Sequence, residues 1–172
     1  MSLKQPAVLK RKYTATNLLP ALRLAAKLRK RMLSVGLTDN GGAIHSAERI
    51  VDILGLHINY KQLTHRNNLR MFASAEISFD ASRDLAVGKK ILIEHVAPLR
   101  ALTQVLLELI DTGKSDASVL KYLRRHYRLV LLSVEETQRL NRLNRSKIEH
   151  GRLEKAGIKL SRAKLKGPIL LK

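Results

Sequence analysis

Residues 89–98 read Lys89-Lys90-Ile91-Leu92-Ile93-Glu94-His95-Val96-Ala97-Pro98, an apolar run that begins after a glycine and ends at a proline. Short apolar runs with such boundaries are typical of buried β-strands, so a strand is predicted over 89–96. A second run, Leu129-Val-Leu-Leu-Ser133, follows Arg128 and predicts a partner strand over 128–133. These two strands decide the fold class, because most of the remaining chain has helical spacing.

Apolar residues at steps of three and four predict the helices. One is expected over 17–35, with Pro20 in a first turn after Thr16 or Asn17 and Gly36 at its end, and a second over 43–54, up to Gly55. Further helices are expected over 99–110, over 115–125, and onward from the capping box Ser133-Val-Glu-Glu136. Short strands are expected over 57–60 and 69–72.

At 172 residues with 45% hydrophobic residues, the chain can bury one core. We expect a basic amino-terminal arm and helix over 1–38, one α+β domain over 39–160 and a basic tail over 161–172. The arm has nine Lys and Arg and no acid, and the segment from residue 139 to the end has eleven against two acids. The expected fold class is α+β, predominantly helical, with a small two-stranded β unit, a crossing helix and flanking basic helices.

The formal charge of +19 is far larger than solubility requires and indicates a polyanionic partner, nucleic acid before membrane. DNA is favoured over RNA, and the oligomeric state is left open. The absence of cysteine excludes disulfides, thiolate zinc sites and thiol nucleophiles. Because no apolar run approaches the ~18 residues of a membrane span, a soluble, cytoplasmic protein without membrane contact is expected.

Glu94 and His95 are the candidate chemical groups of the first strand. Metal-assisted hydrolysis of a phosphodiester needs ligands for a divalent ion, a base for water and cations for the developing charge. A histidine suits the base, because an ordinary imidazole pKa of about 6.5 leaves it mostly neutral at cellular pH. Glu94 suits a metal ligand. Neighbouring strand side chains point to opposite faces, so one shared site requires a bend, which Ala97-Pro98 can supply.

The remaining ligand is expected from the helix that starts at Ser133. Asn141 is the first choice, and Asn144, three residues later, shares its helical face. The ion would be Mg²⁺ or Mn²⁺, with Zn²⁺ as a further option. Cations in three stretches are expected to contact phosphates. They are Arg139, Arg142, Arg145 and Lys147, then Arg23, Lys27 and Arg31, and finally Arg124 and Arg125.

The run Glu94-His95-Val96-Ala97-Pro98-Leu99 is followed by Leu-Val-Leu-Leu-Ser-Val-Glu135-Glu136, Arg139-Leu140-Asn141, Ser146-Lys147 and Lys155-Ala156-Gly157-Ile158. Over about residues 90–160 this pattern resembles small phage and bacterial proteins related to the HNH, or ββα-metal, endonucleases. The resemblance implies a ββα-metal-like core over 89–147, with His95 as the activating histidine and Glu94 and Asn141 as metal ligands. The motif's central Asn is absent, and about thirty residues rather than a short loop separate the strands.

Two functions remain open. One is a metal-dependent endonuclease of HNH type. The other is a non-catalytic DNA- or RNA-binding protein, such as a phage regulator or accessory factor, in which helix 17–35 supplies most of the affinity; Glu94 and His95 are then an ordinary salt-bridged pair. An aromatic content of 3% argues against a base-stacking surface, so contact with backbone phosphates is expected.

Overall fold

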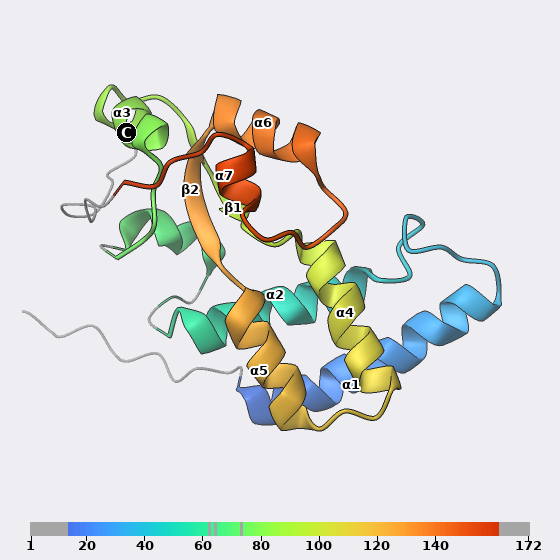
Figure 1. Ribbon diagram of the computed structural model, residues 1–172. Helices are drawn as coiled ribbons and strands as arrows, with labels where there is room; N and C mark the ends of the chain where they lie inside the picture. Colours follow the sequence, from blue (N-terminus) through green and yellow to red (C-terminus); the bar gives the residue numbers. More distant parts are fainter. Residues whose placement is uncertain (1–13, 62, 64, 73, 162–172) are drawn as a thin grey trace, which may run out of the picture.

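The computed structural model describes residues 14–61, 63, 65–72 and 74–161, and these form a mostly helical α+β fold (Figure 1). The predicted fold class is confirmed in this sense: helices surround one two-stranded antiparallel sheet in the described part of the chain. In chain order the elements are α1 (Ala15–Ser34), α2 (His45–Asn59), the 3-10 helix η1 (Arg66–Met71), α3 (Phe79–Ala86), β1 (Ile91–His95), α4 (Leu99–Asp111), α5 (Asp116–His126), β2 (Leu129–Ser133), α6 (Val134–Leu143) and α7 (Arg152–Lys155).

Both predicted strands are found, and they pair with Ile91 opposite Ser133 and His95 opposite Leu129. The second edge of β2 is covered by the segment 76–78. The N–H of Leu131 donates to Glu76 O at 2.8 Å, and the carbonyl oxygen of Leu131 accepts from the N–H of Ser78 at 3.0 Å. Every residue of β2 is buried, which explains the run of four apolar residues, 129–132, before Ser133.

The segment 76–78 is in turn covered by the last described residues. Phe79 N–H donates to Lys159 O at 3.0 Å, and Ser161 N–H donates to Ile77 O at 2.8 Å. The segments 76–78 and 159–161, far apart in the sequence, therefore meet beside β2. Of the predicted basic tail over 161–172, Ser161 joins this edge, and residues 162–172 lie outside the described part.

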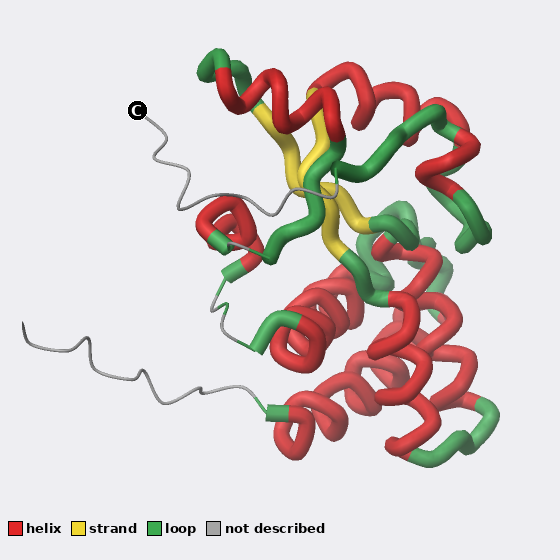
Figure 2. The backbone as a smooth tube through the Cα atoms, turned by 60° about the vertical axis from the view of Figure 1, so that its left-hand side comes forward, coloured by secondary structure: helices red, strands yellow, loops and turns green. Residues whose placement is uncertain are grey.

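The sheet separates two apolar clusters. Leu129 and Leu131 of β2 face the main core, which is built with α1, α2, α4 and α5. Val130 and Leu132 face a smaller cluster built with α6 and α7. Figures 1 and 2 show these two groups of helices on either side of the strands. The helix predicted to cross the strand pair, α6, packs on both strands.

Helix α1 starts earlier than predicted. Thr14 and Asn17 form a capping box, in which Asn17 N–H donates to Thr14 Oγ1 at 3.4 Å and Thr14 N–H donates to Asn17 Oδ1 at 2.8 Å. Pro20 therefore lies inside the helix instead of in its first turn. The apolar face of α1, which includes Leu22, is buried in the main core. The basic segment 1–38 thus supplies a core helix, while residues 1–13 lie outside the described part.

The predicted end of α2 at Gly55 is wrong, and so is the short strand over 57–60, because the helix continues to Asn59. Gly55 has a different role: a Cβ there would overlap the ring of Tyr127, which is only 1% exposed. The second short strand, predicted over 69–72, is also wrong. That segment belongs mainly to η1, whose Arg70 Nη2 donates to Ile91 O at 3.2 Å on β1.

Helices α4, α5 and α6 form as predicted. In the capping box of α6, Ser133 N–H donates to Glu136 Oε2 at 2.9 Å and Glu136 N–H donates to Ser133 Oγ at 3.1 Å. The hydroxyl of Ser78, which caps α3, donates to the same carboxylate. Glu136 is 1% exposed, so this first-turn acid joins α3, β2 and α6 from inside the protein.

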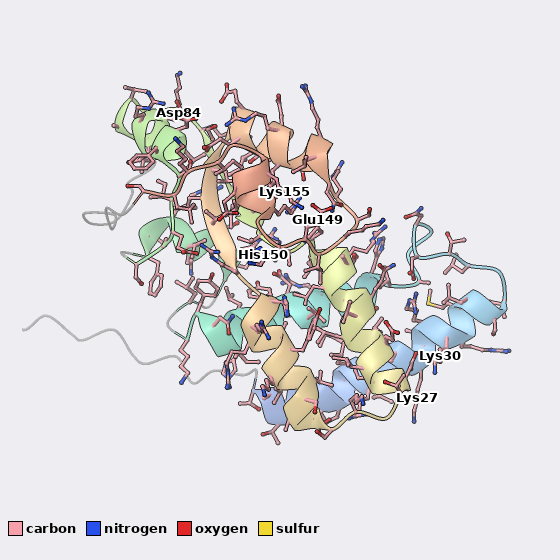
Figure 3. The ribbon with its side chains drawn as sticks, in the orientation of Figure 1. Lys27, Lys30, Asp84, Glu149, His150 and Lys155 are labelled. Carbon is pink, nitrogen blue, oxygen red and sulfur yellow. The ribbon has the colours of Figure 1, made fainter. Side chains whose placement is uncertain are left out.

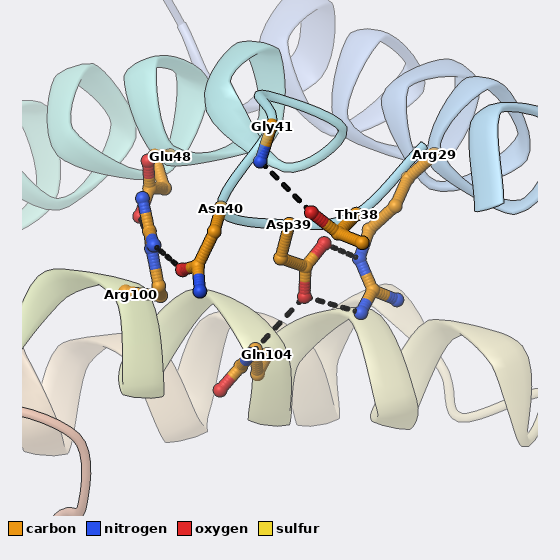
Figure 4. A network of polar contacts seen from close by, with 8 residues as sticks. All are labelled: Arg29, Thr38, Asp39, Asn40, Gly41, Glu48, Arg100 and Gln104. Carbon is orange, nitrogen blue, oxygen red and sulfur yellow. Dashed lines mark hydrogen bonds and ion pairs between the residues drawn. The ribbon is translucent and has the colours of Figure 1, made fainter. Parts of the chain in front are cut away.

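The loop between α1 and α2 is held on α4 by a polar network (Figure 4). Asp39 accepts two hydrogen bonds from Arg29 of α1, at 2.8 and 2.7 Å, and one from Gln104 of α4 at 3.2 Å. Hydrogen bonding to Arg29 holds the pKa of Asp39 below its usual value. Arg100 of α4 donates to Asn40 Oδ1 at 2.8 Å. Arg29 and Arg100 are therefore engaged in fixing the fold.

Substitution of Gly55 by alanine is expected to destabilise the protein by about 2 kcal/mol, the usual cost of overpacking a filled core. The loss is expected although alanine favours helix by about 1 kcal/mol over glycine. Urea unfolding measures the difference. The exposed Ser46→Ala variant in the same helix should change stability by less than about 0.5 kcal/mol. A Gly55→Ala protein as stable as the wild type contradicts the packing of Tyr127 on α2.

Candidate histidine site and nucleic-acid interface

Glu94 and His95 lie at the end of β1 and face opposite sides of the sheet. His95 pairs with Leu129, whose side chain belongs to the main core, and Glu94 pairs with Val130 on the α6 side. Directly opposed residues of an antiparallel pair share one face, so the two side chains diverge. The bend expected at Ala97-Pro98 follows them but does not bring them to a common partner.

His95 is part of a nearly buried cluster with Asp52 and Tyr127. Its Nε2 lies 3.1 Å from Asp52 Oδ1, and the Tyr127 hydroxyl donates to the same oxygen at 2.7 Å. The His95 and Tyr127 rings meet edge to face, with centroids 5.3 Å apart. The side chains of His95 and Asp52 are 11% and 10% exposed. We call these three residues the histidine cluster.

The ionisation of Asp52 sets the state of the imidazole. Burial alone would raise the pKa of Asp52, but the hydrogen bonds from His95 and Tyr127 outweigh it and hold the pKa below its usual value. An ionised carboxylate only accepts hydrogen bonds, so Nε2 of His95 carries a proton and donates it in the hydrogen bond to Asp52. In a neutral imidazole Nδ1 is then an acceptor. No hydrogen bond from the described residues engages Nδ1.

Glu94 lies in a different environment. It is half-buried, and its carboxylate forms no hydrogen bond or ion pair with the described residues. Burial raises the pKa of Glu94 above its usual value, and electrostatic interactions with His95, Arg152, Arg66 and Arg145 offset that effect only in part. The site around Glu94 is therefore a partly desolvated carboxyl group among arginines.

The two predicted amide ligands do not share a helical face. Asn141 is half-buried on α6, but Asn144 follows the last residue of the helix in an extended conformation, with φ −165°. The Oδ1 of Asn144 accepts from the N–H groups of Ser146 and Lys147, each at 2.9 Å, and its Nδ2 donates to Lys147 O at 3.2 Å. Its amide is thus occupied in forming its own turn.

Arg152 joins the end of β1 to the end of α6. Its guanidinium donates to His95 O and Val96 O, each at 3.0 Å, to Asn144 O at 2.6 Å and to Leu140 O at 3.5 Å. Arg152 is only 3% exposed, and burial lowers its pKa. This arginine satisfies carbonyls at the end of a helix, where no intrahelical donor is available.

Asp52, Tyr127 and Arg152 are absent from the sequence-based site. A usable signal exists for Asp52, because it lies on the apolar face of a predicted helix beside Val51 and Leu54, and a carboxylate at a core position requires donors. Arg152 gives no such signal, since the short segment around it has no clear period. Its partners are carbonyls, which every residue carries.

Some of the predicted phosphate-binding cations form ion pairs within the protein, and others do not. Every Asp and Glu of the chain lies within the described residues, so the acidic side chains that could pair with these cations are all described. On the α6 side, Arg142, Arg145 and Lys147 are exposed and form no ion pair. Arg139 lies 3.9 Å from Asp80. The segment 142–147 is therefore a compact group of available cations.

The helices of the main core provide a second and third set. Arg23 is paired with Asp116 at 2.5 Å, so it is partly neutralised. Lys27 and Arg31 on α1, and Arg124 and Arg125 on α5, are exposed without an ion pair in the described part of the chain. In Figure 3, Lys27, on α1, lies in the lower right part of the view, and Lys155, on α7, lies in the upper part. The available cations thus occur both on helices of the main core and on the α6 side of the sheet.

A divalent metal fits these residues poorly. Within the described ranges, no group of three or more His, Asp or Glu side chains is placed to hold an ion. Glu94 is the only carboxylate of the predicted ligand set, and the charges of Arg66, Arg145 and Arg152 around it oppose a cation. Asn144 is engaged in its turn, and His95 binds Asp52. These residues therefore do not form a site suited to a divalent ion.

The chain matches no protein-family model, no curated protein and no solved structure. Within the described residues, no helix has both the length and the apolar character needed to span a membrane.

Replacement of Glu94 by glutamine is expected to stabilise the protein at pH 7 by up to about 1 kcal/mol, because an ionised carboxylate is then no longer desolvated. A raised pKa in the folded state favours the protonated form, so this advantage should disappear below about pH 4, where wild-type Glu94 is itself protonated. Urea unfolding as a function of pH tests the sign. Glu108→Gln, at an exposed position on α4 without an ion pair, is the matched control. Destabilisation by Glu94→Gln at pH 7 contradicts the assignment.

Proposed function

We propose that the protein binds a polynucleotide through its phosphate backbone, with DNA as the favoured partner and RNA as the alternative. The supporting observation is the imbalance of charges after ion pairing. Nine of the 14 acidic side chains are in ion pairs. They engage ten of the 25 described Lys and Arg residues, which leaves fifteen without an ion pair. Phosphates are the partners that release counterions when such cations bind.

The segment 142–147 is the best-supported contact within this surface. Arg142 lies in the last turn of α6, and Arg145 and Lys147 lie in the turn that Asn144 shapes. Arg152 fixes the same turn from beneath through Asn144 O. A rigid backbone that presents three exposed cations lowers the ordering cost of binding a polyanion.

Helix α1 is a weaker basis for affinity than its sequence implies. Three of its cations, Arg23, Arg29 and Lys30, are paired with acids, which leaves Lys27 and Arg31 as available groups. We therefore assign most of the affinity to the surface that includes 142–147.

The triple variant Arg142→Ala, Arg145→Ala and Lys147→Ala is expected to weaken duplex DNA binding at least tenfold in moderate salt. Each lost phosphate contact should reduce the slope of log affinity against log salt by about 0.9. Fluorescence anisotropy at several salt concentrations measures both, with duplex DNA and RNA compared in parallel.

The control for this experiment removes the same charge from paired cations. Arg23→Ala, Lys30→Ala and Arg83→Ala together lower the net charge by the same amount but leave 142–147 intact. Equal losses in the two triple variants would mean that net charge alone governs binding. A wild-type protein that binds neither polymer in low salt overturns the proposal.

We further propose phosphodiester hydrolysis as a second candidate function, on the strength of the hydrogen bond between Asp52 and His95. Asp52 holds the Nε2–H tautomer, so Nδ1 is the basic atom that can accept a proton from water. In this scheme His95 is the catalytic base and Asp52 is a positioning residue. The nearby positive charge of Arg66, which acts on both Asp52 and Glu94, is suited to a phosphate oxygen.

Cleavage of plasmid DNA and of RNA tests the hydrolytic proposal, with Mg²⁺, Mn²⁺ or a chelator present. His95→Gln should abolish cleavage while nucleic-acid binding persists. Asp52→Asn should slow cleavage by roughly a hundredfold or more and alter its pH profile, since the tautomer is no longer fixed. Urea unfolding separates this effect from loss of structure. Equal cleavage rates in wild type and His95→Gln contradict a catalytic role for His95. Cleavage that requires Mg²⁺ or Mn²⁺ and stops with the chelator contradicts the metal-free scheme and favours Glu94 and Asn141 as metal ligands.

A further inference from the structure

An open cavity of about 560 Å³ lies where α5 ends and β2 begins. Its walls come from the end of α2, from Phe72, Ser74 and Glu76, from the last turn of α5 and from the two residues before β2. Figure 1 shows this junction on the ribbon between the labels of α5 and β2. The volume lies within the ~300–1,000 Å³ typical of small-molecule sites. The arginines that line this cavity are Arg124, Arg125 and Arg128, and none of them belongs to the site proposed around His95.

The inner wall of the cavity is fixed by hydrogen bonds. Asn59 Nδ2 donates to Tyr127 O at 2.5 Å and to Arg124 O at 3.0 Å, so it satisfies carbonyls at the end of α5. The hydroxyl of Tyr60 accepts from Leu129 N–H at 2.7 Å. These polar groups are engaged within the protein, and they hold the wall in place without needing a ligand.

The rim of the cavity carries an excess of positive charge. Arg128 is paired with Glu76 through two contacts, at 2.5 and 2.8 Å. Arg124 and Arg125 are exposed and form no ion pair with the described residues. The rim therefore has three arginines and one carboxylate. Because Glu76 pairs with Arg128, the guanidinium groups of Arg124 and Arg125 are available for an anion.

Aromatic residues gather at the same place. The chain has only six Phe and Tyr residues, and three of them, Tyr60, Phe72 and Tyr127, line this cavity. The Tyr60 and Tyr127 rings meet edge to face at 6.3 Å, with Tyr127 buried behind. Phe72 and Tyr60 are only partly buried. The low aromatic content of the whole chain thus hides a local concentration of rings.

We propose that this cavity binds one nucleotide unit, with its base against Phe72 and Tyr60 and its phosphate held by Arg124 and Arg125. Rings stack on any base, and paired arginines bind phosphate as planar donors. A free mononucleotide and a single unit of an unpaired strand share this chemistry. The site goes beyond backbone binding at 142–147 and does not depend on it.

Calorimetric titration of the full chain with AMP tests the site, with ribose 5-phosphate and adenosine as probes of the two halves of the ligand. Arg124→Ala with Arg125→Ala should weaken AMP binding at least tenfold. Phe72→Leu should weaken AMP but leave ribose 5-phosphate unchanged. Lys27→Ala with Arg31→Ala removes the same charge from α1 and should leave AMP binding unchanged.

A single-stranded tetranucleotide of deoxyadenylate distinguishes the two sources of the nucleotide. Tetranucleotide binding that depends on Arg124, Arg125 and Phe72, with no AMP binding, assigns the cavity to a unit within a strand. The same dependence for AMP assigns it to a free nucleotide. Binding that none of these substitutions weakens, or no binding of either probe, overturns the proposal. Duplex DNA binding should be unchanged in the Phe72→Leu variant, which removes no charge, so failure here is separate from failure at 142–147.

Discussion

One oxygen of Asp52 receives hydrogen bonds from both Tyr127 and His95, and this shared acceptor ties the helical half of the protein to the strands. His95 ends β1, Tyr127 lies between α5 and β2, and Asp52 belongs to α2. A carboxylate with only 10% side-chain exposure is unfavourable without donors, and each hydrogen bond to a charged group contributes about 1.5–3 kcal/mol. The close packing of Tyr127 on Gly55 sets the distance at which these bonds form. Helix α2 is thereby fixed against the point where both strands meet the helices.

The opposite face of β1 has a complementary arrangement with the charge reversed. Arg152 is buried there and satisfies carbonyls of β1, α6 and the turn after α6. The buried anion Asp52, from α2, thus lies on one side of β1, and the buried cation Arg152, from α7, lies on the other. Such ionic groups contribute specificity of arrangement as well as stability, because each has few alternative partners in the interior. The surface cations of 142–147 are positioned as a result of this internal arrangement.

Local periodicity was sufficient for the strands and for most long helices, because the apolar faces of α1, α4 and α5 recur at helical spacing and each strand begins with three or four consecutive apolar residues. It was insufficient at Gly55. This glycine does not end the helix; it leaves room for the ring of Tyr127, which is more than seventy residues away in sequence. The partner of His95 was missed for the same reason, since Asp52 lies 43 residues away. Asn144 illustrates a local error: its side chain bonds to its own turn, and this competes with helix. The pattern of apolar residues does not predict contacts between residues distant in sequence, and it does not predict hydrogen bonds within turns.

The position of residues 159–161 beside the segment 76–78 has a consequence for how the protein is made. During synthesis the amino-terminal helices leave the ribosome first and can associate early, since their contacts are close in sequence. The outer edge of the sheet, however, is completed only by Lys159 and Ser161, which are translated after every helix and strand of the described part. Until then Ile77 and its neighbours are exposed backbone beside the largely apolar strand β2, a surface prone to pairing with other chains. The growing chain is therefore exposed to aggregation through this edge until residues 159–161 join it, and a chain truncated before residue 159 would keep the edge open.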